Sequence, residues 1–428
     1  MTTIFVYIFI NMSNSDIGVY AERHQEPVFS IVLDGKTRIE RCEDMSELEK
    51  TKTGDNGKSV VMPHRGGRTR LLIASVVTAV IIISAAVLMG VVLSENKIES
   101  VTLIGAGATF PMPLILKWAD VYYNKTGQAV KISYLGGGSG AGITQIKNKQ
   151  VDFAGTDAPL SATDSSTYGL VHIPETLGAV VVAYNLPGVE SLRLDGPTLA
   201  RIFMRNITAW NDPAIASLNP NITLPSNQIK TIVRSDSSGT TFVFSGYLSV
   251  VSNEFATLYG QGKSVNWPDV IGASGNPGVT QTIKTTPYSI GYIELAYAIT
   301  NNVPYAMLKN RDGNFVGASL DTISAAASGT TLPAGDGDWS GVSILNAPGA
   351  NAYPIASFTY ILIYKELYNE QSKMNKSAAK ALVDFLWWVV HEGQSYASGL
   401  YYAPLPQSVV SVNEATLDSI TYKGEPIR

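Results

Sequence analysis

The longest hydrophobic stretch of the 428-residue chain covers residues 71–93 and contains no charged side chain. At about 1.5 Å of rise per residue, a helix of this length crosses a hydrocarbon core of roughly 30 Å. Arg65, Arg68 and Arg70 precede the stretch, and no excess of basic residues follows it. Because basic flanks stay in the cytoplasm, we expect a single-pass transmembrane anchor that places the residues after it outside the cytoplasm.

The anchor is longer than the apolar region of an ordinary signal peptide, which favours a segment that is retained. No cysteine follows it, so a lipid attached to cysteine is excluded. Residues 1–70 are mostly polar and weakly patterned, apart from an apolar start at residues 4–10. We interpret them as a cytoplasmic segment or as residues upstream of the true start, because Met62 opens a short basic segment directly before the anchor.

After the anchor, short β-rich runs alternate with helical patterns, which predicts an α/β architecture. The predicted strands are 101–104, 130–134, 179–184, 229–233 and 360–363. The predicted helices are 113–125, 143–148, 195–203, 240–251 and 377–391. In the last helix, an aromatic stripe that includes Phe385 and Trp388 is typical of a core face. Residues 304–351 are rich in glycine, alanine, serine and aspartate, and we expect a long surface excursion there.

The charge balance and the rarity of cysteine and histidine exclude several classes of function. The 31 basic and 35 acidic side chains give a formal net charge of -4, which argues against a nucleic-acid-binding protein. The single cysteine, Cys42, excludes a disulfide within the chain, and the four histidines show no metal-binding spacing. We therefore expect no metal, no cofactor and no nucleic-acid partner.

Three segments rich in glycine and hydroxyl residues each follow a predicted strand and lead into a predicted helix. They cover residues 105–111, 136–142 and 234–241. Glycines let the backbone turn tightly, and a helix N-terminus presents N–H groups that favour an anion. Each segment alone also fits a simpler interpretation: a tight turn, a flexible linker and a helix cap, respectively. Together they predict a site in which uncharged dipoles surround one anion.

Charged residues near these segments narrow the class of ligand. Arg234 supplies a two-pronged donor for an oxyanion, and Asp236 is close enough in sequence to hold its guanidinium group. A carboxylate at Asp157 would repel an anion unless the ligand carries a proton that the carboxylate accepts. Phosphate near neutral pH carries such a proton and sulfate does not, so a carboxylate here would reject sulfate. At this point a turn or cap role for Asp157 is an equally good interpretation.

The same loops belong to longer segments that carry a specific resemblance. In chain order these read GAGATFPMPLILKWADVYYNKTG, GGGSGAGITQIKNKQVDFAGTDAPLS, AWNDPAIASLNPNITLPS, IVRSDSSGTTFVFSGYLS, IGYIELAYA, YPIASFTYILIYKE and LYYAPLPQSVV. The chain resembles the phosphate-binding protein family of the high-affinity phosphate ABC importer over nearly all of residues 101–410. Two departures are visible, because the family usually has a second serine where Gly140 stands and residues 304–351 match it poorly.

The resemblance implies a two-lobed, class II periplasmic-binding-protein fold, with lobe 1 at residues 98–183 plus 354–428 and lobe 2 at 184–353. It implies a membrane-tethered, monomeric receptor that binds inorganic phosphate between the lobes and delivers it to phosphate ABC permease subunits. The implied phosphate-binding residues are Thr109, Phe110, Ser139, Asp157, Arg234, Ser238, Gly239 and Thr240, with Asp236 orienting Arg234.

Three other functions are compatible with parts of the pattern. An exported phosphatase or phosphotransferase with Ser238 or Thr240 as nucleophile would need a nearby base, and no histidine or lysine lies in these loops. A receptor for another tetrahedral oxyanion would use the same donors. A structural cell-surface protein or adhesin would not need polar residues in all three loops. We therefore expect a solute-binding protein and not an enzyme.

Overall fold

The computed structural model describes residues 3–11, 16–24, 100–371 and 374–428. The chain divides into two compact units, Met1–Glu95 and Asn96–Arg428, which are described separately.

In the first unit, β1 (Thr3–Asn11) pairs antiparallel with β2 (Asp16–His24). The apolar start at residues 4–10, the exception in an otherwise weakly patterned segment, thus forms most of β1. Residues 4–10 are all β-branched or aromatic, and such residues favour strands. The predicted anchor at 71–93 lies outside the described residues. Among the residues that are described, no helix is both long enough and apolar enough to cross a membrane.

The second unit is built on a mixed eight-stranded sheet in the order β4–β3–β5–β13–β6–β10–β8–β9. Its strands in chain order are β3 (Val101–Gly107), β4 (Val130–Gly136), β5 (Phe153–Thr156), β6 (Leu170–Asn185), β8 (Lys230–Arg234), β9 (Ile271–Ala273), β10 (Ser289–Glu294) and β13 (Ala356–Tyr364). One parallel group contains β4, β3 and β5, and another contains β10, β8 and β9. Antiparallel pairing of β6 and β13 joins the two groups.

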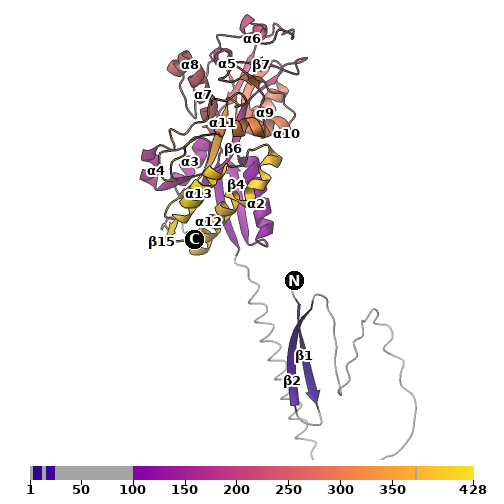
Figure 1. Ribbon diagram of the computed structural model, residues 1–428, viewed down its shortest axis with the longest axis vertical. Coiled ribbons are helices and arrows are strands. Elements are labelled where there is room, and N and C mark those ends of the chain that lie inside the picture. Colours follow the sequence, from indigo (N-terminus) through magenta and orange to yellow (C-terminus); the bar gives the residue numbers. More distant parts are fainter. Residues whose placement is uncertain (1–2, 12–15, 25–99, 372–373) are drawn as a thin grey trace, which may run out of the picture. The chain divides into compact units, whose positions relative to one another are not determined.

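Helices cover both ends of this sheet (Figure 1). Around the end that contains β4 lie α2, α3, α12 and α13, and at the opposite end, near the short strand β7 of a separate three-stranded sheet, lie α5 to α9. The helices are α2 (Met112–Lys125), α3 (Ser139–Lys147), α4 (Ala162–Tyr168), α5 (Gly196–Phe203), α6 (Pro213–Leu218), α7 (Gly239–Val251), α8 (Asn253–Leu258), α9 (Gly275–Thr285), α10 (Leu295–Thr300), α11 (Leu320–Ala327), α12 (Lys376–Val390) and α13 (Gln407–Asp418), with 3-10 turns η1 (Glu392–Tyr396) and η2 (Ser398–Leu400). Short strands complete the unit: β7 (Arg193–Leu194), β11 (Met307–Lys309), β12 (Phe315–Val316), β14 (Thr421–Tyr422) and β15 (Glu425–Pro426).

The long strand β6 runs between the two groups of strands. Its first part, up to Ala179, pairs with β13, and its second part, from Val180, pairs with β10. All of its residues except the last are buried, which is typical of a central strand covered on both faces. The predicted strand 179–184 is therefore only one part of β6, and the run before it was missed because His172, Pro174 and Glu175 interrupt the apolar pattern.

The other predicted strands and helices are present, with ends shifted by up to four residues. The starts of β13 and α3 are shifted most, and α3 begins at Ser139 although the glycines of its first turn resemble a loop. At Gly142 a Cβ atom would lie 2.6 Å from the Cα of Gly107, so only glycine lets this helix pack so closely on the strand. The aromatic stripe of α12 is core as predicted, since Phe385 and Trp388 are buried.

Residues 304–351 are not simply the surface excursion that we expected. They contain β11, β12 and α11, and the side chain of Trp339 is fully buried. The Trp339 ring packs against His172 and Tyr360, and its Nε1 donates to the carbonyl of Ala334 at 2.9 Å. The small and polar residues of this segment give no sign of the buried tryptophan, because one aromatic side chain is enough to fix the segment on the sheet.

Trp339→Ala should lower the free energy of unfolding by about 3–5 kcal/mol, because it empties a large buried volume next to β6 and β13. Denaturant unfolding of the full chain, followed by far-UV circular dichroism, measures this change. Leu258→Ala is the matched control, since Leu258 is 63% exposed and its truncation should change the free energy by less than about 0.5 kcal/mol. Equal effects of the two substitutions would restore the surface-excursion interpretation.

Candidate functional site

The candidate site residues lie at the carboxyl ends of parallel strands. Thr109 follows β3, Ser139 follows β4, Asp157 follows β5, and Arg234 ends β8. In open α/β sheets, ligands bind outside the carboxyl ends of the strands, because loops from neighbouring strands meet there and helices begin there. The topology therefore gathers residues that are more than 100 positions apart in the sequence.

Two tyrosines and one asparagine fix the first loop. The Thr109 hydroxyl oxygen accepts hydrogen bonds from the backbone N–H of Asn276 at 3.0 Å and from its side-chain amide at 3.1 Å. The Thr109 carbonyl accepts from the Tyr297 hydroxyl at 2.6 Å, and the Phe110 carbonyl accepts from the Tyr402 hydroxyl at 2.7 Å. With both carbonyls held, the orientation of the peptide groups in this loop is set.

The second loop contacts both Asp157 and the third loop. The Ser139 hydroxyl accepts from the backbone N–H of Asp157 at 3.2 Å, and the N–H of Gly140 donates to the Ser237 carbonyl at 2.9 Å. A Cβ atom at Gly140 would lie 2.1 Å from the Ser237 hydroxyl oxygen. The serine that the resembling family has at this position is thus replaced by a residue that leaves room for Ser237.

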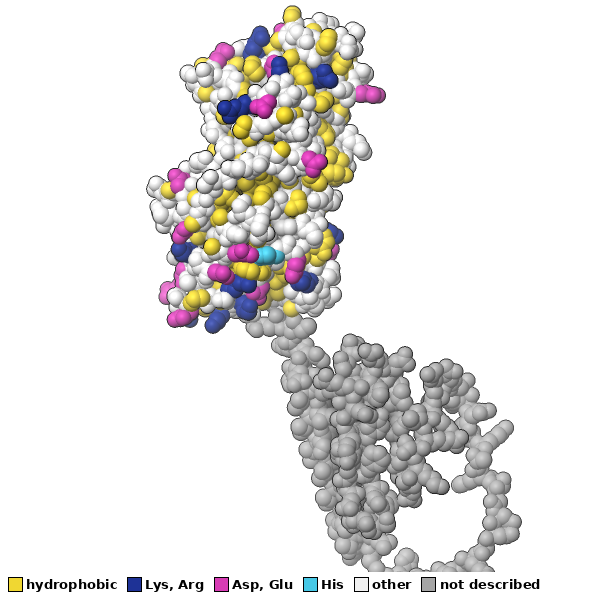
Figure 2. Space-filling model, viewed as in Figure 1, with side chains coloured by type: hydrophobic (Ala, Val, Ile, Leu, Met, Phe, Trp, Pro, Cys, Tyr) yellow, Lys and Arg dark blue, Asp and Glu magenta, His cyan; other side chains and the backbone are white. Residues whose placement is uncertain are grey.

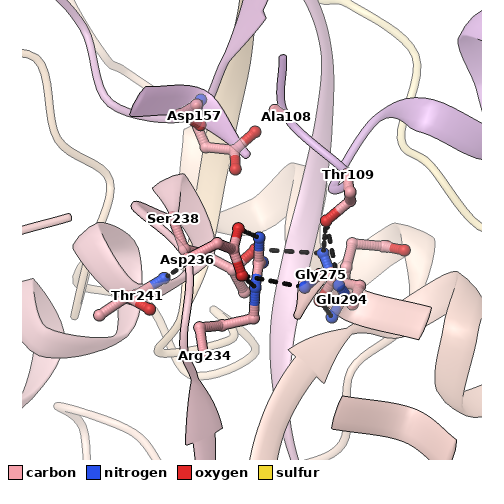
Figure 3. A network of polar contacts seen from close by, with 12 residues as sticks. Ala108, Thr109, Asp157, Arg234, Asp236, Ser238, Thr241, Gly275 and Glu294 are labelled. Atoms are coloured by element: carbon pink, nitrogen blue, oxygen red, sulfur yellow. Dashed lines mark hydrogen bonds and ion pairs between the residues drawn. The ribbon is translucent and has the colours of Figure 1, made fainter. Parts of the chain in front are cut away.

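The third loop holds a buried arginine in a fixed position (Figure 3). The guanidinium of Arg234 donates from Nε to Asp236 Oδ1 at 2.8 Å and from Nη2 to the other carboxylate oxygen. Its Nη1 donates to the Thr240 hydroxyl at 3.1 Å. Asp236 also accepts from the N–H of Gly275 at 2.9 Å, and the Ser238 hydroxyl caps α7 by accepting from Thr241 N–H at 3.1 Å.

The three loops meet at the first turn of α7. A Cβ atom at Gly239 would lie 2.3 Å from the Ser139 hydroxyl oxygen and 2.4 Å from Asp157 Oδ2, so the glycine backbone contacts both side chains. On the other side, the amide of Asn276 bridges the hydroxyls of Thr109 and Thr240 at 3.1 Å each. The candidate residues form one contiguous group. Phe110 belongs to it as the chain neighbour of Thr109, and Ser238 belongs to it because its hydroxyl caps α7.

Comparisons with known proteins identify the family to which the chain belongs. The family model described as the PBP superfamily domain matches residues 94–391. A phosphate-binding protein PstS of Xylella fastidiosa (strain Temecula1) is 42% identical over 75% of this chain and 86% of its own length. A phosphate-binding protein PstS of Methanocaldococcus jannaschii is 38% identical over 82% of this chain and 96% of its own.

This chain belongs to the PstS family of phosphate-binding proteins, within the PBP superfamily. The fold is also that of solved structures. The crystal structure of a phosphate-binding protein from Stenotrophomonas maltophilia has a TM-score of 0.55 at 19% identity, covering 75% of this chain and 99% of that one. The class II α/β fold that the sequence predicts is thereby confirmed.

Burial dominates the electrostatics of this PstS family member at Asp157. Its side chain is almost fully buried, and burial raises its pKa from 3.8 to about 7, although the hydroxyl of Thr359, the charge of Arg234 and the hydroxyl of Ser139 all lower it. The Thr359 hydroxyl lies 2.9 Å from Asp157 Oδ1. A buried carboxyl group with a pKa raised to about 7 by burial is of the kind found at functional sites.

Asp236 behaves in the opposite way. Burial raises its pKa, but the hydrogen bonds and charge of Arg234 outweigh burial and hold the pKa below the usual range. Arg234 and Asp236 thus form a neutral pair, and the site depends on dipoles more than on net charge. On the face shown in Figure 2, basic and acidic side chains are both scattered among polar and hydrophobic ones. In the described part of the chain, no group of three histidine, cysteine or acidic residues could hold a metal ion.

Several contributors to the site were not found from the sequence. Asn276, Tyr297, Tyr402 and Thr359 all hydrogen-bond to candidate residues, yet none of them belongs to a loop with an anion-binding pattern. The segments IGYIELAYA, YPIASFTYILIYKE and LYYAPLPQSVV contain Tyr297, Thr359 and Tyr402 and carry the family resemblance, which was the available signal. Asn276, near the start of α9, had no such signal.

Asp157→Asn should change the pH dependence of stability in a defined direction. Between about pH 4 and pH 7 the folded state keeps a proton that the unfolded chain has released, so the parent's free energy of unfolding falls as pH rises through this window. The asparagine variant lacks this fall. The free energy of unfolding of the variant, relative to that of the parent, should therefore rise by up to about 4 kcal/mol from pH 4 to pH 7 and then stay constant.

Denaturant unfolding of both proteins in phosphate-free buffer between pH 4 and pH 8 measures this difference. The control is Asp321→Asn, because Asp321 is exposed in the first turn of α11 and lies outside the candidate site. An Asp157→Asn curve that runs parallel to the parent's would mean that Asp157 is already ionised at low pH.

Proposed function

We propose that this protein captures inorganic phosphate outside the cytoplasm and delivers it to the permease subunits of an ABC transporter. The observation that carries the proposal is the buried group in which Thr109, Ser139, Asp157, Arg234 and Thr240 meet. The names of its relatives support it, because proteins from two distant organisms that align with three quarters or more of this chain are named phosphate-binding protein PstS.

In this proposal phosphate lies between two lobes, residues 98–183 plus 354–428 and residues 184–353. A ligand that contacts both lobes favours their closed arrangement over the open one. The hydrogen bond from Gly140 to Ser237, which joins loops of the two proposed lobes, supports a closed arrangement in this structure. Strands β6 and β13, which join the two groups of strands, would then act as the hinge.

The proposed division of labour follows from the types of donor and acceptor. Main-chain N–H groups at the first loop and at the starts of α3 and α7, several hydroxyls and the Arg234 guanidinium donate to the phosphate oxygens. Asp157 accepts a hydrogen bond from the proton that phosphate carries near neutral pH, a proton that sulfate lacks. The proposed phosphate-binding residues are Thr109, Phe110, Ser139, Asp157, Arg234, Ser238, Gly239 and Thr240, with Asp236 orienting Arg234.

The hydrogen bonds of the hydroxyls favour binding over catalysis. A nucleophilic hydroxyl needs a base that accepts its proton. The Thr240 oxygen instead accepts hydrogen bonds from Arg234 and Asn276, and the Ser238 oxygen accepts from Thr241 N–H. Donors that surround an oxygen lower its nucleophilicity. We therefore propose that the protein binds phosphate without making or breaking a covalent bond.

We also propose that residues 71–93 anchor the protein in the membrane, with the binding domain outside the cytoplasm. The support is the uncharged length of this stretch and the arginines at 65, 68 and 70 before it. A tether of this kind keeps the receptor close to the permease, so each captured ion has only a short distance to travel.

Arg234→Ala should weaken phosphate binding by about 3 kcal/mol, more than a hundredfold, because a buried charged donor is lost and Asp236 is left without its partner. Asp157→Asn should narrow the preference for phosphate over sulfate, because an amide can donate to sulfate and no longer takes the phosphate proton. Isothermal calorimetry of the purified full chain with phosphate and with sulfate measures both effects.

The matched control is Arg193→Ala, since Arg193 stacks on Phe315 outside the candidate site and its loss should leave both affinities unchanged. Absence of phosphate binding by the parent would overturn the proposed function. Unchanged affinity in Arg234→Ala, or unchanged selectivity in Asp157→Asn, would overturn the assigned contacts.

The full chain should stay with membranes during an alkaline carbonate wash and dissolve only in detergent, because a transmembrane helix is held by hydrophobic burial and not by charge. Fractionation followed by intact mass spectrometry measures this and shows whether residues 71–93 are retained. Release by carbonate, or a mass that begins after residue 93, would contradict a retained anchor.

A further inference from the structure

Glu175 lies in the middle of the central strand β6, and neither the proposed ligand cage nor the hinge needs it. It is fully buried, although an acidic side chain is rare in such a position. Its Oε1 lies 3.4 Å from the hydroxyl oxygen of Thr359, on the neighbouring strand β13. Its Oε2 is buried without a hydrogen-bond partner among the described residues. A buried carboxyl group without a cation beside it normally keeps its proton.

Thr359 connects this carboxyl group to the candidate site. Its hydroxyl oxygen lies 2.9 Å from Asp157 Oδ1 and 3.4 Å from Glu175 Oε1. A hydroxyl carries a single proton and can donate it to only one carboxyl group. The other contact is favourable only if the second carboxyl group supplies a proton of its own, because two acceptors would otherwise face each other. The Thr156 carbonyl oxygen lies at the same 3.4 Å from this hydroxyl, and the short contact is the one to Asp157. A proton on Glu175 would turn its contact with Thr359 from one between two acceptors into a hydrogen bond.

The surroundings decide which acid carries the proton. At Asp157 the hydrogen bond from the Thr359 hydroxyl, the charge of Arg234 and the hydroxyl of Ser139 all lower the pKa. At Glu175 burial raises the pKa well above the usual value, the charge of Asp157 raises it further, and only the contact with Thr359 lowers it. The remaining titratable groups that couple to Asp157 are Glu294, Tyr134, Tyr297 and Tyr360, and burial raises the pKa of each of them.

We propose that Glu175 is a positioning residue that donates its proton to the Thr359 hydroxyl oxygen, so that Thr359 donates its own proton to Asp157 Oδ1. This chain leaves Asp157 Oδ2, the oxygen beside Gly239, as the acceptor for the ligand's proton. Glu175 would thereby determine the preference for a protonated oxyanion without touching it. The inference rests on the proposed function, since the ligand it concerns is phosphate.

The test compares Glu175→Gln with Glu175→Met. Glutamine keeps a donor towards Thr359 and has no charge, so phosphate affinity should stay within twofold of the parent's at every pH. Methionine fills a similar volume without a donor, so phosphate affinity at pH 7.5 should fall about tenfold, with sulfate affinity unchanged. Calorimetric titration with phosphate and with sulfate from pH 5.5 to pH 9 measures both.

Thr359→Val should lose phosphate affinity to the same extent as Glu175→Met, and the double variant should lose no more than either, because one chain is broken at two points. Thr359→Ser should retain the parent's affinity. A merely structural role for Glu175 would instead lower phosphate and sulfate affinity together. Equal losses for the two anions would therefore overturn the proposal.

A charged Glu175 would give a different result again. Removing its negative charge with glutamine would lower the pKa of Asp157, so the acidic limb of phosphate binding would move to lower pH. Such a shift overturns the proposal.

Infrared spectra without any ligand supply an independent readout, because the C=O band of a protonated carboxyl group should be present at pH 8.5 in the parent and reduced in Glu175→Gln. A parent that shows this band but does not bind phosphate would overturn the proposed function alone.

Discussion

The close approach of the first turn of α7 to the loops after β4 and β5 is the contact on which the candidate site depends. Gly239 lies against the Ser139 hydroxyl and the Asp157 carboxylate, with no space for a side chain. The same approach brings Arg234, fixed by Asp236, to the opposite side of the group. If this turn moved away, the hydroxyls, the guanidinium and the carboxylate would lie on separate surfaces, and none of them alone could select an ion.

Much of the fold and part of the site could be predicted from the sequence, for identifiable reasons. Loops such as 105–111 and 234–241 carry local signals, because glycines, hydroxyls and a strand before them determine their own conformation. The strand over residues 101–107 and the helix that ends at Lys125 also have clear periodicity. These local signals, together with the family resemblance, indicated every residue of the group around Gly239 except its supporting partners.

The rest depends on contacts that periodicity does not record. Asn276 bridges Thr109 and Thr240 only because β9 is placed beside β8, and nothing near Asn276 in the sequence indicates this. Trp339 is buried through its contacts with distant aromatic residues, so the small and polar residues around it gave the wrong impression of an exposed segment. The full length of β6 is hidden in the sequence because a histidine, a proline and a glutamate lie within it, and their burial follows from the strands paired on both sides.

The contact between Gly140 and Ser237 has a consequence for how such proteins diverge. A serine at position 140 would collide with the side chain at 237, so the two loops share a fixed amount of space. A hydroxyl gained on one loop must be matched by a smaller residue on the other. The two positions, almost 100 residues apart in the sequence, are therefore expected to vary together. A serine at one of them goes with a smaller residue at the other, so that the volume at their contact stays the same.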